Sequence, residues 1–172
     1  MINICHKELK EKINYNPDTG VFTRIKPGRG ISLKKPAGCV KTKETGKRYV
    51  SIRYDGREFK AHRLAWFFIT GSWPKNEIDH INGDGTDNRF VNLRDVTRIE
   101  NGRNLRRSSA NTSGITGVHF QQKRNRWKSQ IYVNTKLIQI GYFNNIFDAA
   151  CARKNAEIKY GYHKNHGSDR PL

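Results

Sequence analysis

Residues 77–101 have the sequence EIDHINGDGTDNRFVNLRDVTRIEN, which predicts two short strands, joined by a polar loop, and a helix after them. Strand-forming residues occupy 77–81 and 93–96, and the Asn, Gly and Asp residues between them are typical of turns. Thr97 and Glu100 form a capping box, which predicts a helix from about Thr97 to about Arg107.

The same stretch concentrates the carboxylates of a strongly basic chain. The 172 residues include 33 Lys+Arg and 15 Asp+Glu, for a net charge of +18, yet residues 77–100 hold six acids and three arginines. A divalent cation would explain this cluster, and so would solvated turns and helix caps. An EF-hand calcium loop is excluded, because neither Gly83 nor Gly85 follows acidic residues at the required positions.

Composition limits the classes of protein that need to be considered. A pI near 10 points to a polyanionic partner, while 35% hydrophobic and 10% aromatic residues are too many for a disordered basic tail. The longest apolar run, residues 64–69, is too short to span a membrane, and the N-terminus has no signal core. Three widely spaced cysteines predict no disulfide framework. We expect an intracellular protein with no membrane partner and no small-molecule substrate.

Asp79, His80 and Asn101 are candidates for a catalytic centre. Adjacent residues at the end of a strand point to opposite faces, so one of Asp79 and His80 could hold a metal while the other addresses a water. A strand–loop–strand–helix hairpin would return Asn101 against Asp79. A carboxylate and an amide oxygen are hard ligands that suit Mg²⁺ or Mn²⁺, and His80 could then act as a general base.

Upstream, the pattern predicts a helix over 7–15, an extended segment at 21–25 and a basic loop at 26–47. Residues 49–61 are typical of a hairpin with an Asp55-Gly56 turn. His62 opens a helix predicted to end at Thr70. Its imidazole is either an additional metal ligand or a hydrogen-bonded structural histidine, and the structural role is the commoner one.

Several motifs of this half resemble the phage-type HNH homing endonucleases, which share the ββα-metal fold: YNPDTGVF at 15–22, AHRLAW at 61–66, IDHING at 78–83, DNR at 87–89, NLR at 92–94 and Thr97 to Asn101. The resemblance extends from about Leu9 to about Arg107. It implies that His80 is the general base, that Asp79 and Asn101 bind a divalent metal, and that Asn92 orients the loop carrying His80. Asn101 replaces the His of the strict motif, which favours weakly held Mg²⁺ or Mn²⁺ over zinc.

The second half predicts strands at 117–121, 126–133 and 136–143, followed by a helix over 146–160 with Asn145 as its cap. Period two places Arg126, Lys128, Gln130 and Tyr132 on one face of the middle strand. That face could read base edges in a major groove, although an ordinary half-solvated sheet has the same pattern.

Other motifs resemble the plant ethylene-response-factor DNA-binding domain: SGITGV at 113–118, Trp127, Ile131, IGYF at 140–143 and DAA at 148–150. The resemblance covers about 113–160. The positions that match DNA-contacting residues of that family are His119, Gln121, Lys128, Gln130, Tyr132 and Gln139. Several of these positions hold His or Gln where the plant domains often have Arg. The DNA sequence that the plant domains recognise is therefore not expected to be the target of this chain.

Together these features predict an α+β protein. Residues 1–107 would be a ββα-metal HNH nuclease module with a basic β-hairpin region, 108–114 a linker, 115–161 a three-stranded antiparallel sheet packed on one helix, and 162–172 a loose tail. We expect a site-preferring, metal-dependent endonuclease that nicks or cuts double-stranded DNA as a monomer, in the host cytoplasm if phage-encoded. The alternatives are a sequence-specific DNA-binding protein with a vestigial nuclease centre and an RNA-binding protein.

Overall fold

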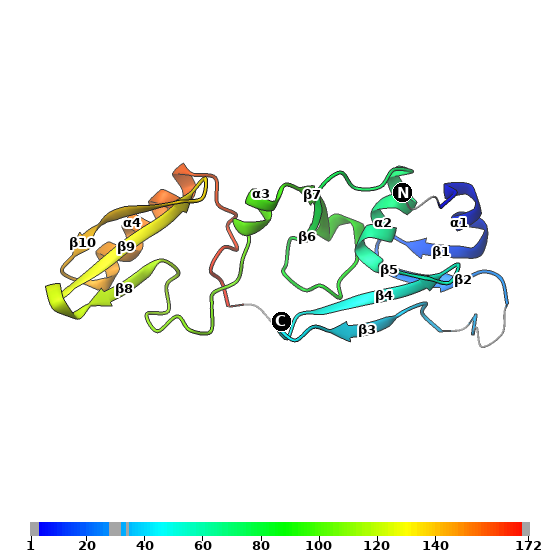
Figure 1. Ribbon diagram of the computed structural model, residues 1–172, viewed down its shortest axis with the longest axis horizontal. Helices are drawn as coiled ribbons and strands as arrows, with labels where there is room; N and C mark the ends of the chain where they lie inside the picture. The colour runs from blue at the N-terminus through cyan, green and yellow to red at the C-terminus, as the bar shows by residue number, and fades with distance from the viewer. Residues whose placement is uncertain (1–3, 28–31, 34, 170–172) are drawn as a thin grey trace. The chain divides into compact units, whose positions relative to one another are not determined.

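The structure is a computed structural model that describes residues 4–27, 32, 33 and 35–169. This part of the chain mixes helices with small antiparallel sheets and forms two compact units, which divide between Thr97 and Arg98. They are called the N-terminal unit and the C-terminal unit below (Figure 1). Within the described ranges, no helix is both long enough and apolar enough to cross a membrane.

The N-terminal unit is built from hairpins and two α-helices among its described residues. Its elements are α1 (His6–Lys12), β1 (Ile13–Asn16), β2 (Val21–Arg24), β3 (Cys39–Thr42), β4 (Arg48–Tyr54), β5 (Arg57–Lys60), α2 (Ala61–Thr70), β6 (Glu77–His80), the 3₁₀ turn η1 (Phe90–Asn92) and β7 (Leu93–Val96). The antiparallel sheets are β1–β2, β3–β4–β5 and β6–β7. The last of these sheets carries Asp79 and His80.

One apolar core ties these elements together. Leu9, Ile13, Ile52 and Leu64 are fully buried, and they come from α1, β1, β4 and α2. Phe67 of α2 also stacks on Trp73, with ring centroids 4.6 Å apart. Burial of large side chains on this scale fixes α2 against the sheets, and α2 in turn carries His62.

The Asp55-Gly56 turn is confirmed. Asp55 and Gly56 have φ values of 48° and 72°, as a type I′ turn requires, and Tyr54 pairs with Arg57 across it. The predicted helix 62–70 is confirmed within one residue, and Gly71, whose φ is 74°, caps its C-terminus.

Two upstream predictions are wrong in part. The first helix ends at Lys12, not at residue 15, because Ile13–Asn16 pair with β2 as strand β1. The segment 26–47, predicted as a loop, contains β3, which pairs with β4. Residues 28–31 and 34 of that segment lie outside the described residues.

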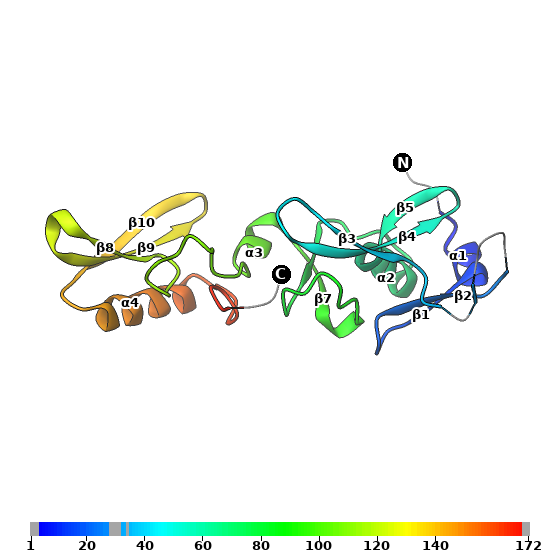
Figure 2. The same cartoon turned by 90° about the horizontal axis from the view of Figure 1, so that it is seen from below.

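In the C-terminal unit, a three-stranded antiparallel sheet packs on one helix. Its elements are α3 (Arg98–Gly102), β8 (Val118–Gln121), the 3₁₀ turn η2 (Gln122–Arg124), β9 (Arg126–Val133), β10 (Lys136–Phe143) and α4 (Ile146–Lys159). The strand order is β10–β9–β8, and α4 runs along one face of the sheet (Figure 2). The predicted cap is confirmed, because Asn145 Oδ1 accepts a hydrogen bond from Asp148 N at 2.8 Å.

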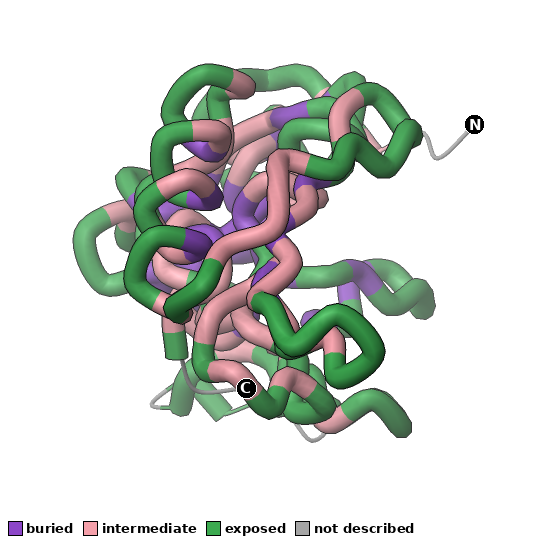
Figure 3. The backbone as a smooth tube through the Cα atoms, turned by 90° about the vertical axis from the view of Figure 1, so that its left-hand side faces the viewer, coloured by how far each residue is buried: buried purple, intermediate pink, exposed green. Residues whose placement is uncertain are grey.

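Burial alternates along β9 as predicted. Ser129 and Ile131 are 0% and 1% exposed and face α4, whereas Arg126 and Tyr132 are exposed. Figure 3 marks the buried, intermediate and exposed residues of the described chain by colour. The sheet therefore keeps one face against the helix and offers the other to solvent or to a partner.

The border between the units lies ahead of the linker predicted at 108–114. Helix α3 ends at Gly102 and does not continue to Arg107. The following residues bond to the segment predicted to be a loose tail: His163 N to Arg103 O, Gly167 N to Leu105 O and Arg107 N to Ser168 O. Residues 98–107 thus belong to the C-terminal unit, because those long-range bonds replace further helical turns.

Candidate active site

Asp79 lies on β6 directly opposite Arg94 on β7. Arg94 donates from Nε and Nη2 to Asp79 Oδ2, at 2.9 and 2.7 Å. The Asp79 side chain is only 9% exposed, so this charge-assisted pair holds the carboxylate in a fixed orientation. The importance of Arg94 was missed in the sequence, because only the strand register reveals that it faces Asp79.

His80 ends β6 and is buried between two other rings. Its imidazole lies 4.9 Å from the ring of His62, at an interplanar angle of 89°, and 6.3 Å from the ring of Tyr49. Burial lowers the pKa of His80, while the Asn88 side chain and Asp79 act in the opposite direction. A lowered pKa keeps the imidazole neutral near pH 7, the form that can accept a proton.

His62 is 5% exposed in the first turn of α2. Burial, followed by the neighbouring His80, lowers its pKa to about 3. No hydrogen bond reaches its Nδ1 from any described residue. Burial thus favours the neutral form of this imidazole, which packs against the ring of His80. The described residues contain no group of three His, Cys, Asp or Glu side chains that could hold a metal.

Asn92 lies at the end of the loop that follows His80 and bonds across it. Its Oδ1 accepts from Asn82 N at 3.0 Å, and its Nδ2 donates to Asn82 Oδ1 at 3.0 Å and to Asp87 O at 2.9 Å. Ile81 N also donates to Asn92 O at 2.9 Å. The side chain thus links the start and the end of the loop that follows His80.

Three of the six acids in the 77–100 window are engaged in local structure. Asp84 Oδ1 accepts from Thr86 N and Oγ1, at 2.9 and 2.7 Å. Asp87 pairs with Arg89, which lowers the pKa of Asp87. Asp95 accepts from Lys75 N and Asn76 N. For these three carboxylates, the turn-and-cap explanation of the acidic cluster is the one that the contacts support.

The β1–β2 hairpin holds the other side of the loop. Tyr15 Oη donates to Asn88 O at 2.6 Å, and Phe90 N donates to Pro17 O at 2.9 Å. Gly20 has a φ of 73°, and a Cβ there would lie 2.5 Å from Arg89 N. The hairpin and the loop can approach this closely only with glycine at residue 20. No local signal in the sequence predicted these contacts.

Asn101, the other predicted metal ligand, lies on α3 in the C-terminal unit. Asp79, His80 and Asn92 all lie in the N-terminal unit, around the β6–β7 pair. Three of the four predicted centre residues are thus gathered by one hairpin.

The six residues predicted to contact DNA lie on one sheet. Lys128, Gln130 and Tyr132 alternate along β9, on the face opposite the buried Ser129 and Ile131. The other three lie opposite residues of β9 on the same face. His119 pairs with Lys128 and Gln139 pairs with Gln130, while Gln121 pairs with Arg126, which precedes Lys128 on that face. Directly opposed residues of antiparallel strands share a face. All six side chains therefore belong to the face away from α4.

Comparison with known proteins gives a match over the region that contains Asp79, His80 and Asn92. Residues 59–103 match the family described as HNH endonuclease, which confirms the predicted HNH resemblance there. Protein 3.8 of Escherichia phage T7 is 31% identical over 78 residues, which are 45% of this chain and 64% of the phage protein. The chain thus covers less than two thirds of that relative. No solved structure matches the chain.

Proposed function

We propose that the chain is a DNA endonuclease of the HNH homing type, in which His80 is the general base. The observation that carries this proposal is the buried His80 beside Asp79, inside the region that matches HNH endonucleases. Phosphodiester hydrolysis needs a group that takes a proton from the attacking water, and a neutral imidazole is suited to that role. Asn92 would keep the loop after β6 in place around this imidazole.

Asp79 and Asn101 would hold a divalent metal, with β6, β7 and α3 as the ββα unit. The donor types fit, since a carboxylate and an amide oxygen are both hard ligands, and Arg94 already orients the carboxylate. Bound Mg²⁺ or Mn²⁺ would stabilise the charge that develops on the phosphate and on the leaving oxygen. In this arrangement, Asp79 binds, His80 moves a proton and Asn92 positions the loop.

The C-terminal unit would bind double-stranded DNA through its exposed sheet face. Residues 98–169 contain 13 Lys and Arg against four Asp and Glu, so the unit favours a polyanion. The six residues predicted to contact DNA offer donors and acceptors for base edges and phosphates: His119, Gln121, Lys128, Gln130, Tyr132 and Gln139. This sheet would thus contribute to the site preference of the protein.

One observation favours a second candidate function. The Arg94–Asp79 pair satisfies the carboxylate without a metal, as expected for a sequence-specific DNA-binding protein with a vestigial nuclease centre. Such a protein would bind the same DNA and leave it intact. Both candidates therefore agree on the partner and differ in the chemistry.

Nicking of a supercoiled plasmid with and without Mg²⁺ distinguishes the two. We expect metal-dependent cleavage that falls by about 10²–10⁴ in His80→Ala, with DNA affinity within a few-fold of the wild type. His163→Ala is the matched control and should cleave normally, since His163 follows α4 and is assigned no role in the proposed centre or on the DNA-binding sheet face. Cleavage by His80→Ala at the wild-type rate would contradict the base assignment, and no cleavage by any form would favour the vestigial centre.

A further inference from the structure

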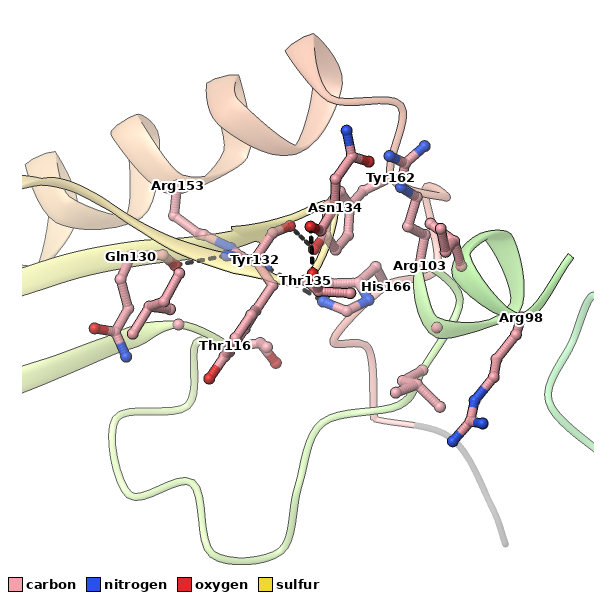
Figure 4. Close-up of a pocket in the computed structure, with 15 residues that line it drawn as sticks. Arg98, Arg103, Thr116, Gln130, Tyr132, Asn134, Thr135, Arg153, Tyr162 and His166 are labelled. Carbon is pink, nitrogen blue, oxygen red and sulfur yellow. Dashed lines mark hydrogen bonds between the residues drawn. The ribbon is translucent and has the colours of Figure 1, made fainter.

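The C-terminal unit contains a cavity of about 610 Å³ that the proposed cleavage chemistry does not use. Its size falls within the range of about 300–1,000 Å³ that is common for small-molecule sites. Figure 4 shows that its side chains come from α3 and the residues after it, from the segment before β8, from β9 and its turn, and from α4 and the segment after it.

The cavity lies where β9 loses its neighbouring strand. The β8–β9 pairing ends at Ser129, opposite Val118. Beyond that point, individual hydrogen bonds replace the strand pairing along this edge of β9. Gln130 N donates to Gly117 O at 2.8 Å, and Tyr162 Oη donates to Tyr132 O at 2.6 Å. These contacts provide hydrogen-bond partners for the backbone of the β9 edge, while the nearby side chains of Tyr132 and Leu137 stay exposed.

The walls of the cavity are apolar and unusually exposed. Ile99, Leu105, Tyr132 and Leu137 all line it, and they are 52%, 49%, 60% and 48% exposed. Apolar side chains gathered at a recess in this way mark a binding site more often than the same residues scattered singly. An apolar or aromatic group is thus the expected occupant of the cavity floor.

The charged residues of the lining are all cationic. Arg98, Arg103 and Arg153 line the cavity, and no Asp or Glu does among the described residues. Arg153 is committed elsewhere: it is 3% exposed and bonds to Glu157 and to Gln130 O. Arg98 and Arg103 therefore set the charge that an occupant meets, and they favour an anion.

We propose that this cavity receives an unpaired nucleotide of bound DNA, with its base against Tyr132 and Leu137 and its phosphate near Arg98 and Arg103. An aromatic ring that carries a phosphate matches both halves of the lining, and stacking on an aromatic side chain combined with cationic contacts is the general mode of binding single-stranded nucleic acid. Bases inside a duplex expose only their edges, so a recess with apolar walls selects a base that has left the stack.

The inference rests on the DNA partner of the proposed function, but not on its cleavage chemistry. α3 contributes Arg98, Ile99 and Gly102 to the cavity, and Asn101 of the same helix does not line it. An occupant would thus contact the helix that carries the proposed metal ligand while leaving that residue on another face.

Fluorescence anisotropy in EDTA tests this on the full chain, with two DNA duplexes that differ only by one unpaired central nucleotide. We expect the wild type to bind the duplex with the unpaired nucleotide about tenfold more tightly. Leu137→Glu should abolish that preference, because it places a carboxylate in the cavity. Ile158→Glu is the matched control: it makes the same change at an exposed position of α4 outside the cavity, and it should keep the preference.

The preference is a ratio within each variant, so a general effect of the added charge cancels. Arg98→Gln tests the phosphate contact in the same way and should reduce the preference several-fold. Its control is Lys159→Gln, which removes an exposed cation of α4 outside the cavity and should keep the preference. Equal affinity of the wild type for both duplexes would overturn the inference and leave the proposed function standing. A preference that survives in Leu137→Glu would overturn it too. A chain that binds neither duplex would contradict the DNA partner itself.

Discussion

The imidazole rings of His62 and His80 lie edge to face, with their centroids 4.9 Å apart and their planes at 89°. One ring comes from α2 and the other from the end of β6, and both residues are less than 7% exposed. Tyr49 adds a third ring, 5.7 Å from His62 and 6.3 Å from His80. Three segments that are distant in the sequence thus restrict how the His80 ring can turn.

We therefore expect His62 to position His80 for proton transfer. His62→Ala should lower the cleavage rate by roughly 10–100-fold with little change in KM, because misplacement of a catalytic group by about 1 Å can cost about 10²-fold. His62→Phe keeps an aromatic edge against His80 and should recover most of that loss. Single-turnover nicking at several DNA concentrations measures both parameters.

Thermal unfolding and DNA affinity serve as controls for these variants. Full activity in a folded His62→Ala protein would contradict the positioning role. A rate loss that matches the loss of folded protein at the assay temperature would assign His62 to stability alone.

The same histidine predicts a dependence of stability on pH. The pKa of His62 falls from its ordinary 6.5 to about 3 on burial. Between these values the unfolded chain binds a proton that the folded chain does not, so the free energy of unfolding decreases as the pH falls from about 6.5 towards 3. The full effect of one such group is about 1.4 kcal/mol per pH unit. Urea unfolding at pH 7, 5.5 and 4.5 should show this decline.

His62→Phe removes this titration, so its stability should fall less steeply over the same pH range. The lowered pKa of His80 acts in the same direction and remains in the variant, so some decline should persist. Parallel stability curves for wild type and variant would show that His62 is not buried as a neutral group.

Local signals explain which parts of the fold could be predicted from the sequence. Asp-Gly at 55–56 requires two positive φ values, and the structure has both. Asn145 and Asp148 have the spacing of a helix cap and form one. The period of two along 126–133 divides β9 into the faces that the structure shows. Each of these features depends on residues that are close in the sequence.

What the sequence did not reveal depends on distant partners. Arg94 reaches Asp79 only because the β6–β7 register places them opposite one another. Tyr15 bonds to Asn88, which is 73 residues away, and Gly20 allows the close approach. Helix α3 stops at Gly102 because the residues after it bond to the segment beyond α4. Helix propensity and capping patterns contain no information on such contacts.

Chelation should stop cleavage and leave the fold intact. Asp79 and Asn101 are only two proposed ligands, and two protein ligands cannot hold a fold together as the four ligands of a structural zinc site do. The described residues contain no group of three or more His, Cys, Asp or Glu side chains that could hold such a metal. We expect the melting temperature to stay within about 1–2 °C when EDTA is added, because a structural zinc site would contribute several kcal/mol of folding energy. Circular dichroism melts and DNA binding measure this, and added Mn²⁺ should restore cleavage. Large unfolding in EDTA would contradict the proposal of a weakly held hard metal.

The last prediction concerns the face of the β8–β9–β10 sheet that lies opposite α4. Arg126 and Lys128 are two residues apart on β9 and both lie on this face. Their cross-strand partners are Gln121 and His119, respectively. If both cations meet phosphates, the double variant Arg126→Ala, Lys128→Ala should make the plot of log affinity against log salt shallower by about 1.8, at about 0.9 per phosphate. The matched control is Lys154→Ala, Lys159→Ala, which removes two exposed cations of α4 and should leave the slope unchanged. Anisotropy titrations across a salt series compare the two. Equal slopes for wild type and both variants would show that the exposed sheet face does not bind the DNA backbone, whereas a change in the control alone would move the DNA contact to α4.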